Sequence, residues 1–202
     1  MFVLDASGDN GSVTVTAEQA HRVWQEADCL HDQATVEAAL DRMGREITEA
    51  LAGRDPLVLC VMNGGLVAAG HLLTRLGFPL QVDYLHATRY RGDVEGAAEL
   101  HWLVRPQLPL SDRTVLVIDD ILDEGRTLAG ILDYCRQHEA ASVYSAVLVI
   151  KHHGRRDPRI QADFIGVEVD DRYVFGYGMD YKEYLRNAPG IYAVNSRTPN
   201  HD

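Results

Sequence analysis

The strongest constraint on the fold is an apolar run that ends in two adjacent acidic residues, in the segment VLVIDDILDEGRTL at 115–128. An unbroken apolar run of this kind is typical of a strand that is buried on both faces of a parallel sheet. Asp119 and Asp120 follow at the carboxyl end of the strand, where open α/β sheets bind ligands. A helix is expected from about Arg126 to His138. The segment therefore predicts an α/β fold with two carboxylates at its ligand-binding edge.

Similar apolar runs and helical patterns alternate along most of the chain. Helices are expected over 16–28, 32–52 and 66–76, the first of them opened by a capping box of Thr16 and Gln19. Strands are expected over 57–62, 80–86, 100–104, 143–150 and 164–169. Alternating strands and helices favour a parallel sheet. The polar stretch 88–99 is expected to be a mobile loop within a hairpin, residues 1–15 a loose arm or edge strand, and 170–195 a small cap without a helix.

Composition narrows the class of protein. A chain of 202 residues that is 46% hydrophobic can bury the core of one domain without disulfides. Its three cysteines form no CxxC pair, which favours a reducing compartment, and no signal peptide or membrane span is expected. A net charge of -11 argues against binding to nucleic acid or to an anionic membrane. We expect a cytoplasmic protein that binds small molecules.

The turn between the acidic pair and the following helix has the features of a phosphate site. Gly125 suits a positive φ or a close ligand, and the hydroxyl of Thr127 and the N–H groups at the helix start can hold a phosphate. The segment is not a GxxxxGK[ST] loop. The plainer alternative is a surface turn with a solvated aspartate pair.

The whole string of strand, acidic pair and G-x-T turn resembles the type I phosphoribosyltransferases. The resemblance implies that fold, with a core at about 36–170 and a small hood subdomain formed by the N-terminal segment and about 170–195. It implies that Asp119 and Asp120 hold the ribose hydroxyls of 5-phosphoribosyl 1-pyrophosphate (PRPP). The residues implied to wrap the 5-phosphate are Asp123, Glu124, Gly125, Arg126 and Thr127.

Four further segments resemble the hypoxanthine-guanine phosphoribosyltransferases. The first, CVMNGG at 60–65, resembles a pyrophosphate-binding loop with a cis peptide at Met62–Asn63, and implies pyrophosphate contacts from Asn63, Gly64 and Gly65. The second resembles a lid that closes through Arg89 and Tyr90. An ordinary Asn-Gly-Gly turn and a polar loop are the plainer interpretations.

The other two segments concern the base. The resemblance implies that Lys151 donates a hydrogen bond to the exocyclic oxygen of a 6-oxopurine. The segment DDRYVFGYGMDYKEYLRN at 170–187 resembles the family's base-binding segment. In that segment Tyr173 is implied to stack on the purine, the Val174 backbone to bond the base edge, and Arg186 to reach pyrophosphate. The plainer alternatives are that Lys151 is a solvated residue at a strand end and that Tyr173 packs in the core.

The resemblance implies a purine-salvage enzyme that makes IMP or GMP from hypoxanthine or guanine and PRPP, and that forms a homo-oligomer, a dimer or a tetramer. Asp123 is the candidate catalytic residue, because a carboxylate near N7 of the base can take its proton. Mg²⁺ is the implied cofactor, with Asp180, Asp119 and Asp120 at its site. A xanthine-preferring enzyme and a regulatory nucleotide- or RNA-binding protein of the same fold remain alternatives.

Two residues depart from the family pattern. Asn63 stands where many members carry Lys, and Glu124 replaces a small hydroxyl residue, so its side chain is expected to point outward. The pair His152–His153 is not expected to bind a metal, because adjacent strand residues point to opposite faces.

Overall fold

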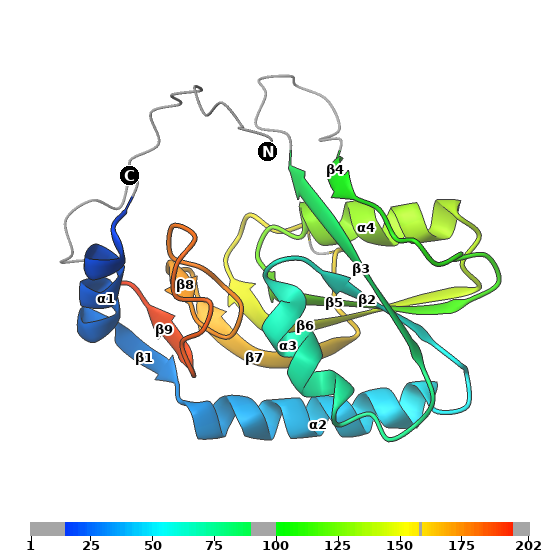
Figure 1. Ribbon diagram of the computed structural model, residues 1–202, viewed down its shortest axis with the longest axis horizontal. Helices are drawn as coiled ribbons and strands as arrows, with labels where there is room; N and C mark the ends of the chain where they lie inside the picture. The colour runs from blue at the N-terminus through cyan, green and yellow to red at the C-terminus, as the bar shows by residue number, and fades with distance from the viewer. Residues whose placement is uncertain (1–14, 90–99, 158, 196–202) are drawn as a thin grey trace, which may run out of the picture.

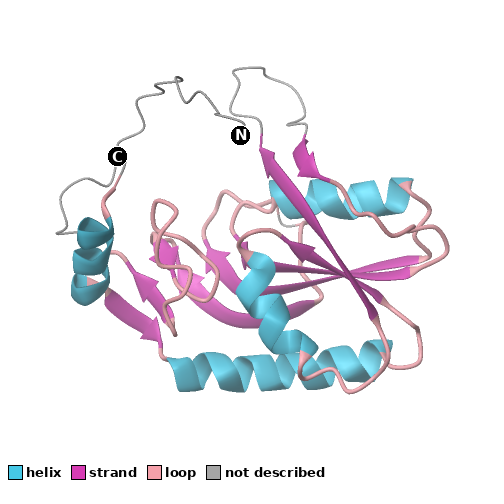
Figure 2. Ribbon diagram, viewed as in Figure 1, coloured by secondary structure: helices cyan, strands magenta, loops and turns pink. Residues whose placement is uncertain are grey.

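A six-stranded sheet forms the centre of the molecule (Figures 1 and 2). The computed structural model describes residues 15–89, 100–157 and 159–195. The strands, in the order β4-β3-β2-β5-β6-β7, are β2 (Leu57–Val61), β3 (Gln81–Arg89), β4 (Leu100–Val104), β5 (Thr114–Leu122), β6 (Ser142–His152) and β7 (Phe164–Asp170). All pairs are parallel except β3–β4, the expected hairpin at one edge. The predicted fold class is confirmed.

Helices cover both faces of this sheet (Figure 2). α2 (Gln33–Leu51) and α3 (Gly65–Leu73) pack on one face, and α4 (Arg126–Gln137) packs on the other. Along β2, Leu57 and Leu59 belong to the core under α4, whereas Val58 and Cys60 belong to the core under α2 and α3. Because successive side chains of a strand point to opposite faces, a strand covered on both faces is apolar throughout.

The predicted helices are present, with corrections at their ends. α1 (Ala17–Glu26) begins with the expected capping box, in which Thr16 and Gln19 each accept a backbone N–H from the other. It ends before Asp28, because Asp28–His31 forms the strand β1, which was not predicted. α3 ends at Leu73, three residues before its predicted end, and β3 continues through Arg89 into the stretch predicted as a loop. Residues 90–99 and the predicted arm over 1–14 lie outside the described residues.

A second, three-stranded sheet lies beside the carboxyl ends of the main strands. Its order is β1-β9-β8, with β8 (Val174–Phe175) and β9 (Ile191–Ala193), and both pairings are antiparallel. α1 packs against it through a small separate core that includes Ala20, Val23 and Phe175. We call α1, β1 and residues 171–195 the hood. As predicted, residues 170–195 contain no helix; the boundaries of the hood as a subdomain remain a prediction.

Within the described ranges, every helix is too short or too polar to cross a lipid bilayer.

Candidate active site

A cavity of about 400 Å³ opens at the carboxyl ends of β2, β3 and β5. Parallel strands bring their carboxyl ends to one edge, so residues from distant parts of the chain meet there. Its lining comes from four segments, namely Val61, Met62, Asn63 and Gly64 after β2, His86, Ala87 and Thr88 of β3, Asp119 to Leu128 except Leu122, and Glu183 and Arg186 of the hood.

The loop after β2 needs glycine at the points where other segments of the protein pack closely against it. The Met62–Asn63 peptide bond is cis, as the resemblance implied. A Cβ on Gly64 would overlap the Asp120 carboxylate, and a Cβ on Gly178 would overlap the carbonyl oxygen of Gly64. Gly178 also has φ +107°, a conformation that other residues rarely adopt. The hood therefore approaches the candidate pyrophosphate loop closely at Gly178, where the two backbones meet without room for a side chain. Gly65 lies buried behind this loop, outside the cavity lining.

The two aspartates at the end of β5 lie side by side, with Asp119 buried and Asp120 half-buried. Asp119 is 8% exposed, and its Oδ1 accepts the backbone N–H of Asp120 at 2.9 Å. Burial and the neighbouring charge of Asp120 raise the pKa of Asp119 well above its ordinary value. Burial also raises the pKa of Asp120, although hydrogen bonds and the charge of Arg186 act in the opposite direction. Two carboxylates held close together in the free protein favour a ligand that brings hydroxyl donors or a cation.

This pair fits a magnesium ion. Mg²⁺ in phosphate-transfer sites takes one or two protein carboxylates and completes its shell with water and substrate oxygens. Asp119 and Asp120 both line the cavity. Asp180 is outside its lining, and its Oδ1 lies 2.9 Å from Nη2 of Arg186. Among the described residues, no group of three or more His, Cys, Asp or Glu side chains is placed to hold a metal ion.

The turn before α4 presents backbone donors to the cavity. Gly125 is the N-cap of α4, has φ +82°, and offers no side chain to cap the first N–H groups. The helix start at Arg126 and Thr127 lines the cavity. N–H groups at a helix N-terminus favour a phosphate. The geometry thus suits the phosphate role inferred from the sequence.

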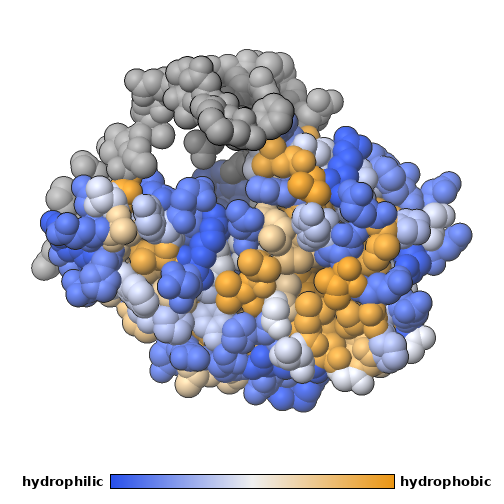
Figure 3. Space-filling model, viewed as in Figure 1, coloured by the Kyte–Doolittle hydropathy of each residue, from blue (hydrophilic) through white to orange (hydrophobic). Residues whose placement is uncertain are grey.

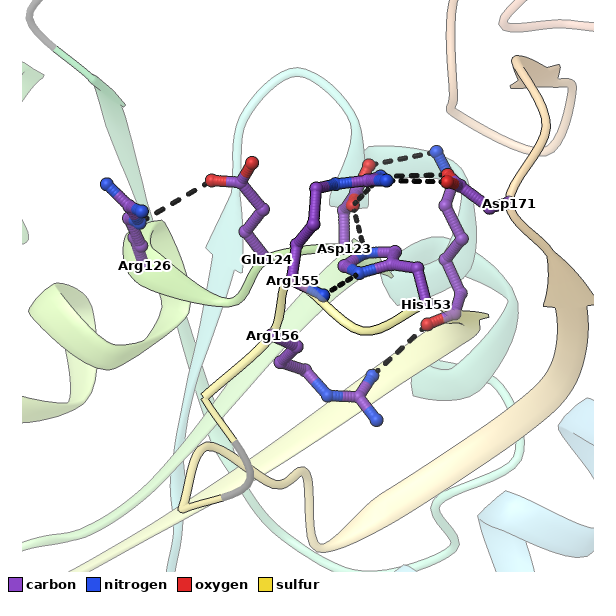
Figure 4. Close-up of polar contacts among 8 residues, drawn as sticks. Asp123, Glu124, Arg126, His153, Arg155, Arg156 and Asp171 are labelled. Carbon is purple, nitrogen blue, oxygen red and sulfur yellow. Dashed lines mark hydrogen bonds and ion pairs between the residues drawn. The ribbon is translucent and has the colours of Figure 1, made fainter.

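The prediction that the Glu124 side chain points outward, away from the site, is wrong. Its side chain is 28% exposed, lines the cavity, and lies 3.5 Å from Nε of Arg126 (Figure 4). The ion pair with Arg126 draws the carboxylate toward the helix start and offsets its negative charge there.

Asp123 lies among cations. Nζ of Lys151 donates to its Oδ2 at 2.8 Å, and Nε2 of His153 lies 2.6 Å from its Oδ1 (Figure 4). A guanidinium nitrogen of Arg155 is 3.9 Å away. Partial burial raises the pKa of Asp123, but the hydrogen bonds of Lys151 and His153 and the charge of Lys151 outweigh it and lower the pKa below its ordinary value. The free protein therefore holds Asp123 ionised.

The base-binding candidates of the hood are arranged around β8. Tyr173 is 44% exposed, lies outside the cavity lining, and has its ring at a steep angle to the ring of Tyr181. Val174 is buried, and its backbone pairs with Ala193 in the small sheet. Arg186 lines the cavity and donates to the carbonyl oxygen of Gly178. The lid candidates are only partly described: the backbone of Arg89 ends β3, and Tyr90 lies outside the described residues.

Four residues at the site were missed in the sequence. His86, Thr88 and Glu183 line the cavity, and His153 contacts Asp123. The alternation of exposed and buried residues along β3 does not indicate which of them face a ligand. His153 was considered only as a metal ligand, although its place after a strand end beside Lys151 is the position from which a side chain reaches the carboxyl edge of a sheet.

Comparison with known proteins decides the family. The family model "Phosphoribosyl transferase domain" matches residues 26–183. A hypoxanthine-guanine phosphoribosyltransferase of Streptococcus pneumoniae is 32% identical over 161 residues, which cover 80% of this chain and 88% of that protein. The chain belongs to the hypoxanthine-guanine phosphoribosyltransferase family. A crystal structure of a hypoxanthine phosphoribosyltransferase from Staphylococcus aureus superposes with a TM-score of 0.80 at 25% identity, and covers 85% of this chain and 94% of that one.

A longer relative carries this family's domain within a larger protein. The bifunctional protein TilS/HprT of Listeria monocytogenes is 35% identical over 162 residues, 80% of this chain. The match spans 25% of that relative's length.

Proposed function

We propose that the protein is a purine-salvage phosphoribosyltransferase that makes IMP or GMP from hypoxanthine or guanine and PRPP and releases pyrophosphate. One observation carries the proposal. A single cavity is lined by the carboxylate pair Asp119 and Asp120, by the N-terminus of α4 and by Arg186, and Asp123 lies in its wall within reach of Lys151. These groups match the ribose hydroxyls, the 5-phosphate and the pyrophosphate of PRPP, and the purine base.

We propose the following roles for the chain's own residues. Asp119 and Asp120 accept the ribose hydroxyls. The 5-phosphate rests on the turn of Asp123, Glu124, Gly125, Arg126 and Thr127. Asn63, Gly64, Gly65 and Arg186 serve the pyrophosphate, and Arg89 and Tyr90 close the lid.

For the base, Tyr173 stacks on the purine and the Val174 backbone bonds its edge. Lys151, which only donates hydrogen bonds, selects a carbonyl over an amino group at C6. Asp123 accepts the proton of N7 while N9 attacks the anomeric carbon. In the free protein the Lys151 ammonium donates to the Asp123 carboxylate. When the base binds, the ammonium moves from this carboxylate to the exocyclic oxygen of the purine.

Magnesium is the proposed cofactor, with Asp119 and Asp120 at its site and Asp180 beside it. When bound, the ion neutralises charge on the leaving pyrophosphate. The raised pKa values of the pair are consistent with an ion, because a cation in the cavity would favour the charged carboxylates.

An assay of the purified protein tests the function. PRPP and Mg²⁺ are supplied with hypoxanthine, guanine, xanthine or adenine, and nucleotide formation is measured for each. We expect turnover with hypoxanthine and guanine and none with adenine. A preference for xanthine would select the xanthine alternative. Turnover with adenine alone, or with no purine, would remove the assignment, and a gel shift with RNA would then test the regulatory alternative.

Replacing Lys151 should weaken the use of 6-oxopurines. We expect Lys151→Met to lower kcat/KM for hypoxanthine by ~10–100-fold, because a hydrogen bond from a charged donor contributes ~1.5–3 kcal/mol. The KM for PRPP should change little. Steady-state kinetics with each substrate varied in turn measures both. Lys182→Met, at the other lysine of the chain, is the matched control and should behave as the wild type.

We further propose a cytoplasmic homo-oligomer, a dimer or a tetramer. Support for association comes from one face of β3 and β4, where Val82, Tyr84 and Leu103 are 49%, 47% and 53% exposed. In Figure 3 hydrophobic residues gather where β3 and α3 lie in Figure 1. The free cysteines Cys29, Cys60 and Cys135 fit a reducing compartment.

Association through this face has a direct test. Val82→Asp combined with Leu103→Asp should shift the mass in solution toward the monomer, measured by light scattering. An unchanged mass would place the interface elsewhere.

A further inference from the structure

The contact between His153 and Asp123 has a fixed geometry. The backbone N–H of Arg155 donates to Nδ1 of His153 at 3.0 Å. Nδ1 is therefore an acceptor without a proton, and the proton of the ring sits on Nε2. Nε2–H points at Oδ1 of Asp123, at 2.6 Å (Figure 4). The ring is thus held at both nitrogen atoms in one neutral tautomer.

Burial and an ion pair keep the ring in this position. The side chain of His153 is only 3% exposed. The next segment is tied down by Arg155, whose guanidinium makes two hydrogen bonds to the Asp171 carboxylate in the hood, at 2.6 and 2.8 Å. Arg156 adds a bond to the carbonyl oxygen of Lys151. The loop that carries His153 is therefore held to the hood through Arg155 and to the end of β6 through Arg156.

Lys151 and His153 hold different oxygens of the same carboxylate. Lys151 takes Oδ2 and His153 takes Oδ1. Each carboxylate oxygen can accept a second hydrogen bond, but the N7–H of a purine has the most room at the oxygen whose donor has left. Lys151 reaches the carboxylate with an unbranched four-carbon chain, and the proposed reaction draws its ammonium to the base oxygen. The imidazole of His153 is buried and held by two hydrogen bonds, and it has no such alternative partner. Oδ2 is thus the oxygen that is freed for the base.

We propose that His153 is a positioning residue for catalysis: its Nε2–H anchors Oδ1 of Asp123, so that Oδ2 faces N7 of the base after Lys151 has moved. This inference rests on the proposed function, because it assigns the partner of the proposed proton acceptor. Among the described residues, the charged groups that face this carboxylate within 4 Å are Lys151, His153 when protonated, and Arg155.

Three variants test the role. His153→Leu removes the donor, His153→Gln places an amide N–H near the position of Nε2, and His152→Leu changes an exposed neighbour that pairs with Glu168 instead. We expect His153→Leu to lower kcat by ~10–100-fold, since a misplaced catalytic group loses much of its effect. The KM for PRPP should stay within about twofold of the wild-type value, because the phosphate and ribose contacts are untouched. His153→Gln should recover most of the loss, and His152→Leu should show none.

The pH profile separates positioning from a structural role. Loss of the His153 hydrogen bond should raise the pKa of Asp123, because a bond to the ionised form lowers it. The acidic limb of kcat/KM should therefore move to higher pH in His153→Leu and return in His153→Gln. Full activity of His153→Leu, or equal losses in both variants with unchanged thermal unfolding, would overturn the proposal.

A measurement on the unaltered protein covers the case in which His153→Leu does not fold. ¹⁵N NMR of the wild-type protein labelled at histidine should show His153 with Nε2 protonated and Nδ1 bare at neutral pH. The opposite tautomer, or a ring averaged between both, would contradict the anchoring geometry. Inactivity of the wild type with every purine would instead remove the proposed function, so the two failures are distinguishable.

Discussion

Replacing Asp123 by Asn should reduce kcat by ~10²–10⁴, the usual contribution of a positioned general base. Asparagine keeps the size of the side chain but is a poor proton acceptor. It also presents an NH₂ group to Lys151 or His153, both of which donate to this side chain in the free protein. The KM for PRPP should change modestly, because the ribose contacts come from other residues and the substitution keeps the backbone groups of the turn that hold the phosphate.

Single-turnover kinetics with saturating PRPP measures this effect at the chemical step. The matched control is Asp133→Asn, an exposed aspartate of α4 that pairs only with Arg136 among the described residues. We expect the control to retain wild-type rates. Near-normal turnover in Asp123→Asn would remove the residue from its role as proton acceptor.

Replacing Asp119 by Asn should abolish efficient use of PRPP and at the same time stabilise the free protein. The variant loses a charged acceptor for the ribose hydroxyls, so kcat/KM for PRPP should fall by ~10–100-fold or more. It also removes a buried carboxylate whose ionised form is disfavoured by burial and by the charge of Asp120. The Oδ1 atom of asparagine still accepts the N–H of Asp120, so the local turn is retained.

The sign of the stability effect follows from the raised pKa. A carboxyl group whose pKa is higher in the folded state binds protons more strongly there, so stability falls as pH rises from the unfolded value through the raised folded value. The penalty is full above the folded pKa and absent below the unfolded one. Thermal unfolding without ligands should therefore show a higher midpoint for Asp119→Asn at pH 7 and a smaller difference near pH 4.

Bound substrate should reverse this order. With PRPP and Mg²⁺ the wild type should gain more thermal stability than the variant, because it binds the ligand more tightly. Equal midpoints of the two proteins in the free state would show that the pair is not strained by its charges.

The main sheet was predictable because its strands are self-evident in the sequence. Runs such as Leu57–Val61 are apolar throughout because they are buried on both faces of the sheet. The turn before α4 was predictable for a similar reason: strand, acidic pair and glycine are neighbours in the chain. The strand Asp28–His31 was not predictable, because its residues are only partly buried and its partner strand, β9, is far away in the sequence.

The contacts of side chains were harder to predict than the elements that carry them. Lys151 and Asp123 were both identified, but their mutual hydrogen bond depends on the register between β5 and β6. Glu124 was expected to point outward because a second carboxylate near a phosphate is unfavourable. Its pairing with Arg126, two residues away, supplies the missing compensation.

The pairing of β1 with β9 has a consequence for the order in which the protein matures on the ribosome. Asp28 is synthesised before its partner Ala193, and the whole main sheet lies between them in the sequence. Tyr173, Val174 and Arg186, which are proposed to bind the base and the pyrophosphate, also follow the last strand of that sheet. A nascent chain that ends before β8 therefore contains every strand of the main sheet but cannot complete the β1-β9-β8 sheet. The proposed base contacts can form only after residues 171–193 have emerged.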